Sequence, residues 1–267
     1  MTSKVKVKVL SWNILASEWI TKKDYPDIAN AELFNTKKRI KTIIDKLKTY
    51  NADILLLQEV MPDEYKILNK YFKDEFYITP IQPIKWSYKN NENTKSESGN
   101  VTLVRLRKYT PIELNLDTQP LSYTKLSHFC RITQCKNNET NKVITLYNIH
   151  LDDLSSVKRN KQISLLLKFD NEINKTPTKT YKPCIIAGDF NQVYRENSKL
   201  YNIPKFTVHN FCNTYYIEKN INIDNILSRG FKEDKLSKCS NLSDDTEDIF
   251  KNIGSDHIPV IADIVLG

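Results

Sequence analysis

Residues 184–193, "CIIAGDFNQV", hold the pattern that decides the fold. Four small or apolar residues run through Gly188 into Asp189, and Asn191 follows two positions later. A buried strand that ends in a carboxylate places a charge where burial is costly unless a cation meets it. The stretch therefore predicts a core strand whose end enters a polar site with a cation in it.

Other strand-like runs end in the same way. Lys and Val alternate over residues 4–10 and lead to Asn13, and the apolar run at 52–57 stops at Gln58 and Glu59. The remaining polar positions next to predicted strands are His150, Asp189, Asn191, Asp224, Asp256 and His257. Each one alone is typical of a turn or a helix cap. If the strands form one sandwich, its rim gathers four acids in one cleft: Glu59, Asp189, Asp224 and Asp256.

The order of the predicted elements favours an α+β fold. Apolar residues recur at helical spacing over 33–48 and again from about 156, and Pro62 opens a further helix. Strands are expected at 100–106, 111–116, 127–135, 143–149, 184–188, 221–228 and 258–266. Because the strands come in clusters and do not alternate strictly with helices, a two-sheet sandwich with outer helices fits best. The 267 residues suit a single domain, 1–267.

Composition narrows the partners and the compartment. The formal charge of +8 favours nucleic acid, nucleotides or acidic headgroups, although a lysine-rich solvated surface is an equal alternative. Five cysteines without C-x-x-C spacing indicate neither a disulfide framework nor a zinc ribbon, so we expect reduced, mostly buried thiols. No apolar run approaches ~18 residues. We therefore expect an intracellular, cytoplasmic monomer, with the nucleus as an alternative location and no membrane association.

Carboxylates held close together repel one another, so either their pKa values rise or a cation lies among them. Mg²⁺ prefers oxygen ligands and is typically held by one or two carboxylates plus the phosphate of a substrate. Zinc would require clustered His or Cys, and the chain has no H-x-H. Ser255 as a hydrolase nucleophile lacks the G-x-S-x-G elbow. The pattern therefore predicts Mg²⁺-assisted hydrolysis of a phosphate ester.

The ordered motifs resemble the endonuclease/exonuclease/phosphatase superfamily. They are "SWNIL", "LQEV", "SGN", "NIHLDD" with Arg159 and Gln162 downstream, "GDFN", "IDNIL" and "SDHIPV", and they span 13–257. They resemble the branch that includes poly(A)-shortening deadenylases, nocturnin-like and 2′,5′-phosphodiesterases, and tyrosyl-DNA phosphodiesterases. This resemblance implies a four-layer α/β/β/α sandwich of two mixed β-sheets flanked by helices, with the active site at one rim.

The resemblance also implies roles for individual residues. Glu59 corresponds to the main Mg²⁺ ligand, with Mn²⁺ as an alternative metal, and Asn13 and Asp256 support it. Asp189 corresponds to the residue that orients or deprotonates the attacking water.

The other roles concern the phosphate. Asn191 would position the phosphate and the water. His257 would bind the phosphate while Asp224 holds its ring, and His150 would contact the phosphate or the leaving group. Arg159 is assigned to substrate binding on the same grounds.

These features predict a Mg²⁺-dependent phosphodiesterase that hydrolyses a nucleic acid or oligonucleotide by in-line attack of water. Lys85, Trp86 and Tyr88 would form a loop that binds the strand by phosphate contact and base stacking, or else simply a solvated loop. One alternative is a phosphatase that acts on a small or lipid-linked phosphate such as an inositol phosphate. Another is a catalytically inactive binding module.

Overall fold

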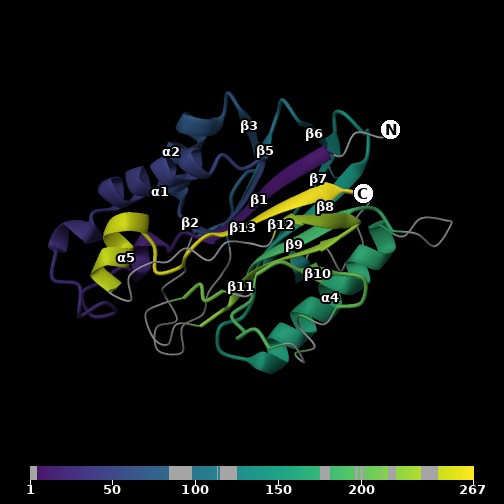
Figure 1. Ribbon diagram of the computed structural model, residues 1–267. Helices are drawn as coiled ribbons and strands as arrows, with labels where there is room; N and C mark the ends of the chain where they lie inside the picture. Colours follow the sequence, from purple (N-terminus) through teal and green to yellow (C-terminus); the bar gives the residue numbers. More distant parts are fainter. Residues whose placement is uncertain are drawn as a thin grey trace.

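The computed structural model describes residues 5–83, 98–112, 114, 125–174, 181–195, 198, 201, 203–210, 212–215, 221–235 and 246–267. Two mixed β-sheets pack face to face, with helices on the outer side of each (Figure 1). The predicted α+β four-layer sandwich is therefore confirmed.

The first sheet runs β12 (Phe231–Lys235), β13 (Val260–Leu266), β1 (Val5–Asn13), β2 (Ile54–Val60), β5 (Gly99–Arg105) and β3 (Phe76–Ile78), and β4 (Gln82–Pro83) also pairs with β5. β1 and β2 are parallel, whereas β1 and β13 are antiparallel. Val5, Val7 and Val9 are buried between the sheets, as their alternation with exposed or half-buried lysines predicts. The same strand carries Asn13 to the rim.

The second sheet runs β10 (Thr207–Val208), β11 (Asp224–Arg229), β9 (Cys184–Asp189), β8 (Val143–His150), β7 (Cys130–Asn137) and β6 (Tyr109–Ile112). The parallel register of β8 and β9 pairs His150 with Asp189. The antiparallel register of β9 and β11 pairs Asp224 with the same Asp189. Strand pairing alone therefore aligns three predicted site residues at one end of this sheet.

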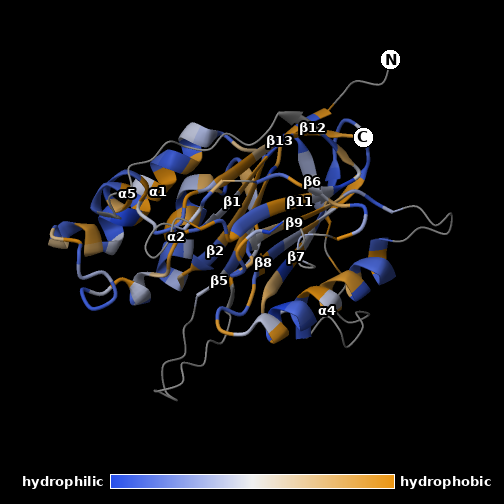
Figure 2. Cartoon of the chain, turned by 60° about the horizontal axis from the view of Figure 1, so that its bottom comes forward, coloured by the Kyte–Doolittle hydropathy of each residue, from blue (hydrophilic) through white to orange (hydrophobic). Residues whose placement is uncertain are grey.

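The helices cover the outer faces. α1 (Thr36–Tyr50), α2 (Pro62–Phe72) and α5 (Thr246–Ile253) contribute to the core cluster on the outer face of the first sheet, and α4 (Ser156–Asn174) packs on the second. Asn35 caps α1 by accepting hydrogen bonds from the backbone N–H groups of Lys37 and Lys38. In Figure 2, α4 carries both hydrophobic and hydrophilic surface and lies beneath the sheet that contains β8 and β9.

One polar network crosses the apolar interior. Asn148 on β8 donates through Nδ2 to the backbone oxygens of Leu57 and Val101, each at 3.0 Å, on strands of the other sheet. Its Oδ1 accepts from Gln58 Nε2 at 2.7 Å, and Asn100 Nδ2 donates to its backbone oxygen at 2.9 Å. All these groups are buried, so breaking one bond would leave an unsatisfied polar atom. The network fixes the two sheets against each other directly below the rim.

Some expectations need correction. β3, β12 and α5 were not predicted, because they are short or adjoin strongly polar sequence that offers little hydrophobic periodicity. Cys130, Cys135 and Cys184 are free and buried as expected, but Cys212 is disulfide-bonded, so the expectation of reduced thiols is wrong there. None of the described helices combines the length and the apolar character that a bilayer crossing requires.

Candidate active site

A pocket of about 540 Å³ opens at the rim where strand ends of both sheets meet. Its polar lining consists of Glu59, His150, Asp153, Asp189, Asn191, Tyr215, Asp256 and His257. Leu15, Trp19, Leu154, Val193, Ile221 and Ile223 form its apolar lining. The pocket therefore joins a charged interior to apolar surfaces.

Glu59 enters the pocket because β2 is irregular at its end. The pairing of β2 with β5 shifts register between Leu57 and Val60, and Glu59 takes a left-handed φ of 57°. Its Oε1 accepts from Asn13 Nδ2 at 2.8 Å, and its Oε2 accepts from the backbone N–H of Ala16 at 2.9 Å. Strained backbone of this kind persists only where the surroundings over-determine it. Both carboxylate oxygens are thus held in place.

Asp189 lies at the centre of the pocket. Its Oδ1 accepts from the backbone N–H of Asn191 at 2.7 Å, and its Oδ2 accepts from Asn13 Nδ2 at 3.1 Å. His150 Nε2 lies 3.7 Å from Asp189 Oδ2 and 3.8 Å from Glu59 Oε1. Burial and the neighbouring charge of Asp224 raise the pKa of Asp189 to about 6, despite the opposing effect of the two histidines. The carboxylate is therefore more basic than an exposed aspartate.

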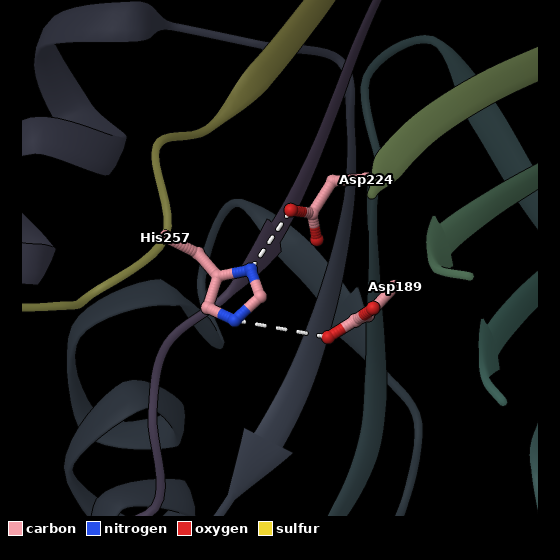
Figure 3. Close-up of side chains that lie close together, drawn as sticks. All are labelled: Asp189, Asp224 and His257. Atoms are coloured by element: carbon pink, nitrogen blue, oxygen red, sulfur yellow. Dashed lines mark hydrogen bonds and ion pairs between the residues drawn. The ribbon is translucent and has the colours of Figure 1, made fainter. Parts of the chain in front are cut away.

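His257 faces Asp189 from the other sheet (Figure 3). Its Nδ1 is 2.8 Å from Asp224 Oδ2, and its Nε2 is 3.7 Å from Asp189 Oδ2. Burial acts to lower the pKa of His257, but the charges of Asp224, Asp256 and Asp189 outweigh it and raise the pKa well above its usual value. Asp224 thus fixes the ring so that Nε2 points to the carboxylate-rich side of the pocket.

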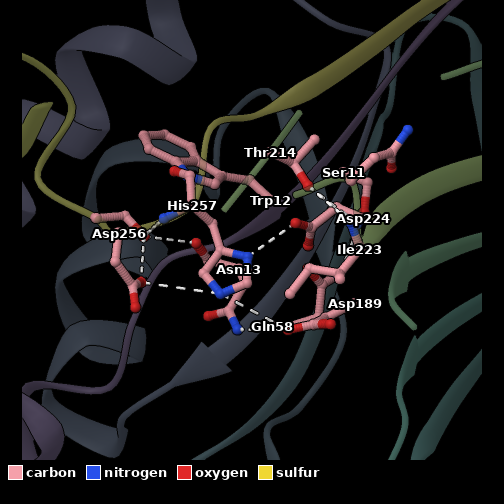
Figure 4. A network of polar contacts seen from close by, with 12 residues as sticks. Ser11, Trp12, Asn13, Gln58, Asp189, Thr214, Ile223, Asp224, Asp256 and His257 are labelled. Carbon is pink, nitrogen blue, oxygen red and sulfur yellow. Dashed lines mark hydrogen bonds and ion pairs between the residues drawn. The ribbon is translucent and has the colours of Figure 1, made fainter. Parts of the chain in front are cut away.

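The segment before His257 is held by hydrogen bonds to β1 (Figure 4). Ser255 Oγ donates to the backbone oxygen of Asn13 at 2.8 Å and accepts from the backbone N–H of His257 at 3.1 Å. Trp12 Nε1 donates to the backbone oxygen of His257 at 2.8 Å. These contacts tie the loop between α5 and β13 to the strand that carries Asn13.

Asp256 is positioned by a residue from a distant loop. Tyr25 donates from its hydroxyl to Asp256 Oδ2 at 3.1 Å, while Asp256 Oδ1 lies 3.9 Å from His257 Nε2. The Tyr25 ring packs edge-on against Phe250 of α5 at a centroid distance of 5.0 Å. Burial and the charge of Glu59 raise the pKa of Asp256, although His257 opposes this. The carboxylate is therefore held next to the histidine without a hydrogen bond to it.

The comparison with protein families can now be stated. The model of the Endonuclease/Exonuclease/phosphatase family matches residues 10–257. The chain belongs to that family. Members of this family hydrolyse phosphoester bonds, and the resemblance drawn from the motifs is confirmed.

Relatives with printed descriptions place the chain within the family. It is 23% identical over 208 residues to the CCR4-Not complex 3′-5′-exoribonuclease subunit Ccr4 of Neosartorya fischeri, covering 69% of this chain and 27% of that protein. The chain thus spans about a quarter of the length of this curated relative. A crystal structure of ANGEL2, described as a 2′,3′-cyclic phosphatase in complex with adenosine-2′,3′-vanadate, superposes with a TM-score of 0.76 at 16% identity, covering 98% of this chain and 96% of that one. The human Nocturnin catalytic domain with bound sulfate superposes with a TM-score of 0.66 at 18% identity, covering 97% and 93%.

Enzymes of this family typically use a divalent metal ion, and the donor set of the pocket fits one. Glu59, Asp189 and Asp256 contribute carboxylates, whereas none of the described lining residues is Lys or Arg. Burial is the main reason that the pKa values of Asp189 and Asp256 are raised, and a bound cation would offset this cost of burying charged carboxylates. Carboxylate and amide oxygens are the ligands that Mg²⁺ prefers.

Among the described residues, another group of possible ligand atoms also lies close together. Single atoms of Asp189, Asp224 and His257 all lie within 4.8 Å of one another. However, His257 Nδ1 and Asp224 Oδ2 share a hydrogen bond, so these two residues act as a pair rather than as two open ligands. Glu59 and its neighbours therefore suit a hard cation better.

The structure brings eight of the predicted site residues together around the pocket: Asn13, Glu59, His150, Asp189, Asn191, Asp224, Asp256 and His257. It does not bring Arg159 to the lining. Arg159 donates instead to the backbone oxygens of Asp152 and Asp153, at 2.8 and 3.1 Å, and to Gln192 Oε1. Lys85, Trp86 and Tyr88 lie outside the described residues.

Several supporting residues were missed from the sequence. Thr214 Oγ1 accepts from the backbone N–H of Asp224 at 3.1 Å. Buried Arg39 donates to the backbone oxygen of Gly254 at 3.0 Å, to that of Ile14, and to Glu64. Tyr25 acts on a residue 231 positions away. Only Arg39 had a local signal in the sequence. It is a charged residue at helical spacing on the face of the predicted helix that is otherwise apolar and buried.

Proposed function

We propose that the protein is a Mg²⁺-dependent phosphodiesterase that hydrolyses a nucleic-acid or oligonucleotide backbone by in-line attack of water, without a covalent enzyme intermediate. The observation that carries this proposal is the convergence of Glu59, Asp189 and the Asp224–His257 pair on one pocket. These residues supply an oxygen ligand for a cation, a base for water and a donor for phosphate oxygen.

Each residue has a chemical role that its geometry supports. Asp189 would orient the attacking water and accept its proton, because a carboxylate with a pKa near 6 is ionised at neutral pH yet basic enough to help. His257, whose protonated form Asp224 stabilises, would donate from Nε2 to a phosphate oxygen. Asn191 and His150 would position the phosphate and the leaving group.

The cation would be held by Glu59 and Asp256, with Asn13 beside them. When bound there it would neutralise the non-bridging phosphate oxygens. Asn13 would keep the two carboxylates in place, since its Nδ2 donates to both Glu59 and Asp189.

A nucleic-acid substrate is supported by two independent facts. The formal charge of +8 attracts polyanions. Ccr4 is described as an exoribonuclease, and ANGEL2 was crystallised with an adenosine-based group. We also propose that the protein acts inside the cell, which localisation of a tagged protein would test, and that it is a monomer, which size-exclusion chromatography with light scattering would test.

A substrate panel tests the activity directly. Single-stranded RNA and DNA, a 2′,5′-linked oligomer, a nucleoside 2′,3′-cyclic phosphate and inositol phosphates would be incubated with Mg²⁺, Mn²⁺ or EDTA. We expect cleavage of an oligonucleotide that EDTA abolishes and that Glu59→Ala and His257→Ala strongly reduce. Turnover of inositol phosphates alone, or unchanged rates in both variants, would contradict the proposal.

A further inference from the structure

The pocket has apolar surface contributed by both sheets. Leu15 and Trp19 follow β1 of the first sheet, whereas Leu154 follows β8 of the second. The same pocket is lined by the charged groups described above. A ligand that fills this space therefore meets charged groups and apolar side chains together, and in the proposed reaction the scissile phosphate lies at the charged groups.

Leu154 is unusual because it is strongly exposed. Its exposed fraction is 69%, the highest among the exposed large hydrophobic residues of the described part of the chain, and nearby Val157 is 61% exposed. Leaving a leucine in water forgoes about 1.5 to 3 kcal/mol of burial. Of the two, Leu154 lines the active-site pocket, where an exposed apolar side chain offers a surface that a ligand can cover.

The loop that displays Leu154 is firmly held. Arg159 donates to the backbone oxygens of Asp152 and Asp153, and the backbone N–H of Asp152 donates to Gln162 Oε1 at 3.0 Å. The backbone N–H of Ser155 donates to Asp152 Oδ1 at 2.7 Å. These hydrogen bonds fix the backbone on both sides of Leu154. The loop therefore holds this side chain in an exposed position.

Trp19 reaches the pocket from the segment that follows β1 of the first sheet. It ends the short 3₁₀ turn Ser17–Trp19, is half-buried, and packs against the cluster that contains Leu15 and Phe250. Its backbone N–H donates to Ala16 O at 2.9 Å, and Ala16 N–H in turn donates to Glu59 Oε2. The backbone of Trp19 is therefore linked through Ala16 to the proposed metal ligand Glu59.

We propose that Trp19 and Leu154 form a base clamp, two apolar walls that contact the nucleobases flanking the scissile phosphate. This inference rests on the proposed function and narrows its substrate to a phosphodiester with a nucleoside on at least one side. Nucleobases present flat faces that stack on indole or pack on leucine in any sequence. An inositol phosphate offers hydroxyls and further phosphates, which apolar walls do not bind.

The base clamp is tested with substrates that keep the scissile phosphate but lack one neighbouring nucleobase. Wild type, Trp19→Ala and Leu154→Ser would cleave an oligonucleotide and matched oligomers with an abasic residue 5′ or 3′ of the scissile phosphate. We expect each variant to raise KM for the intact oligomer on the order of 10-fold, as loss of one base contact predicts. On the oligomer that lacks the contacted base, the variant and the wild type should be equal.

Leu106→Ser is the matched control. Leu106 is a 40% exposed leucine that follows the last residue of β5, whereas the first residue of β5, Gly99, pairs with Val60 beside the pocket residue Glu59. The control variant should leave KM for every oligomer unchanged. If the variants raise KM equally for intact and abasic oligomers, the side chains do not act through the base and the base clamp is wrong. If the wild type shows no loss on either abasic oligomer, the clamp is wrong as well.

A binding measurement separates the clamp from the activity. Fluorescence anisotropy with a labelled, cleavage-resistant phosphorothioate oligonucleotide would be recorded for the same variants. Weaker binding that depends on the base, without cleavage of the normal oligomer, would uphold the clamp and reject the proposed hydrolysis. Cleavage without base-dependent binding would uphold the proposed hydrolysis and reject the clamp.

Discussion

Replacing Gly188 by alanine tests how the sandwich sets the geometry of the site. Gly188 immediately precedes Asp189 and has a φ of 149°. A Cβ at this position would lie 1.8 Å from the backbone oxygen of Ile149, whereas ordinary contact begins at 3.4 Å. β8 and β9 would therefore have to separate by about 1.6 Å, or the backbone would have to turn.

Both responses have a cost that can be bounded. Backbone strain in a region unsuited to alanine costs roughly 1 to 3 kcal/mol, and each weakened β8–β9 hydrogen bond adds about 1 kcal/mol. We expect Gly188→Ala to lose about 3 kcal/mol of unfolding free energy, measured by urea denaturation. Because His150 and Asp189 are paired across these strands, a displacement on the order of 1 Å should also lower kcat/KM roughly 100-fold.

Gly230→Ala provides the control. Gly230 also has a positive φ, 79°, and its added Cβ would lie 3.1 Å from Pro183 Cα, but it follows the end of β11 opposite Asp224. The Gly230→Ala variant should have a lower free energy of unfolding but a nearly unchanged kcat/KM per folded molecule. The reasoning fails if Gly188→Ala keeps wild-type stability and rate, or if Gly230→Ala loses as much activity.

Three further predictions concern side chains of the site. Asp224→Asn should lower kcat on the order of 100-fold with little change in the melting temperature, because the amide no longer stabilises protonated His257; an unchanged kcat would remove Asp224 from the mechanism. Tyr25→Phe should weaken Mg²⁺ binding about 10-fold by isothermal titration calorimetry, since Asp256 loses its hydroxyl donor; equal affinity would show that the hydrogen bond does not position the carboxylate. The kcat/KM profile at limiting Mg²⁺ should fall as pH drops through about 6, because Asp189 becomes protonated below its raised pKa and cannot accept a proton; the limb should move to lower pH at saturating Mg²⁺, and a flat profile would exclude Asp189 as the base.

The sequence predicted which residues converge where these residues lie next to clear strand patterns. β1 and β9 are strongly periodic or continuously apolar, and their ends gave Asn13 and Asp189 with the correct neighbours. The fold class followed from clustered strands and the ordered motifs. What local patterns could not give are contacts between distant segments, such as that of Tyr25 with Asp256.

Arg159 illustrates a second limit. Its position in the motif order pointed to substrate, yet its guanidinium is engaged with loop backbone and Gln192. Sequence order indicates that a residue belongs near the site, but only packing decides which of its atoms face the ligand. Glu59 shows the same limit for the backbone, because strand alternation does not reveal the left-handed turn that redirects its side chain.

The amide network around Asn148 joins the sheets within two residues of His150 and next to Glu59. Since the first sheet supplies Glu59, with His257 just before its strand β13, while the second supplies His150 and Asp189, neither half of the sandwich contains the proposed centre alone. The proposed activity thus depends on the alignment of the two sheets. A shift of one sheet relative to the other that is too small to expose the core would already separate the site residues and lower the catalytic rate. Substrate preference, in contrast, can diverge through rim loops without disturbing that alignment.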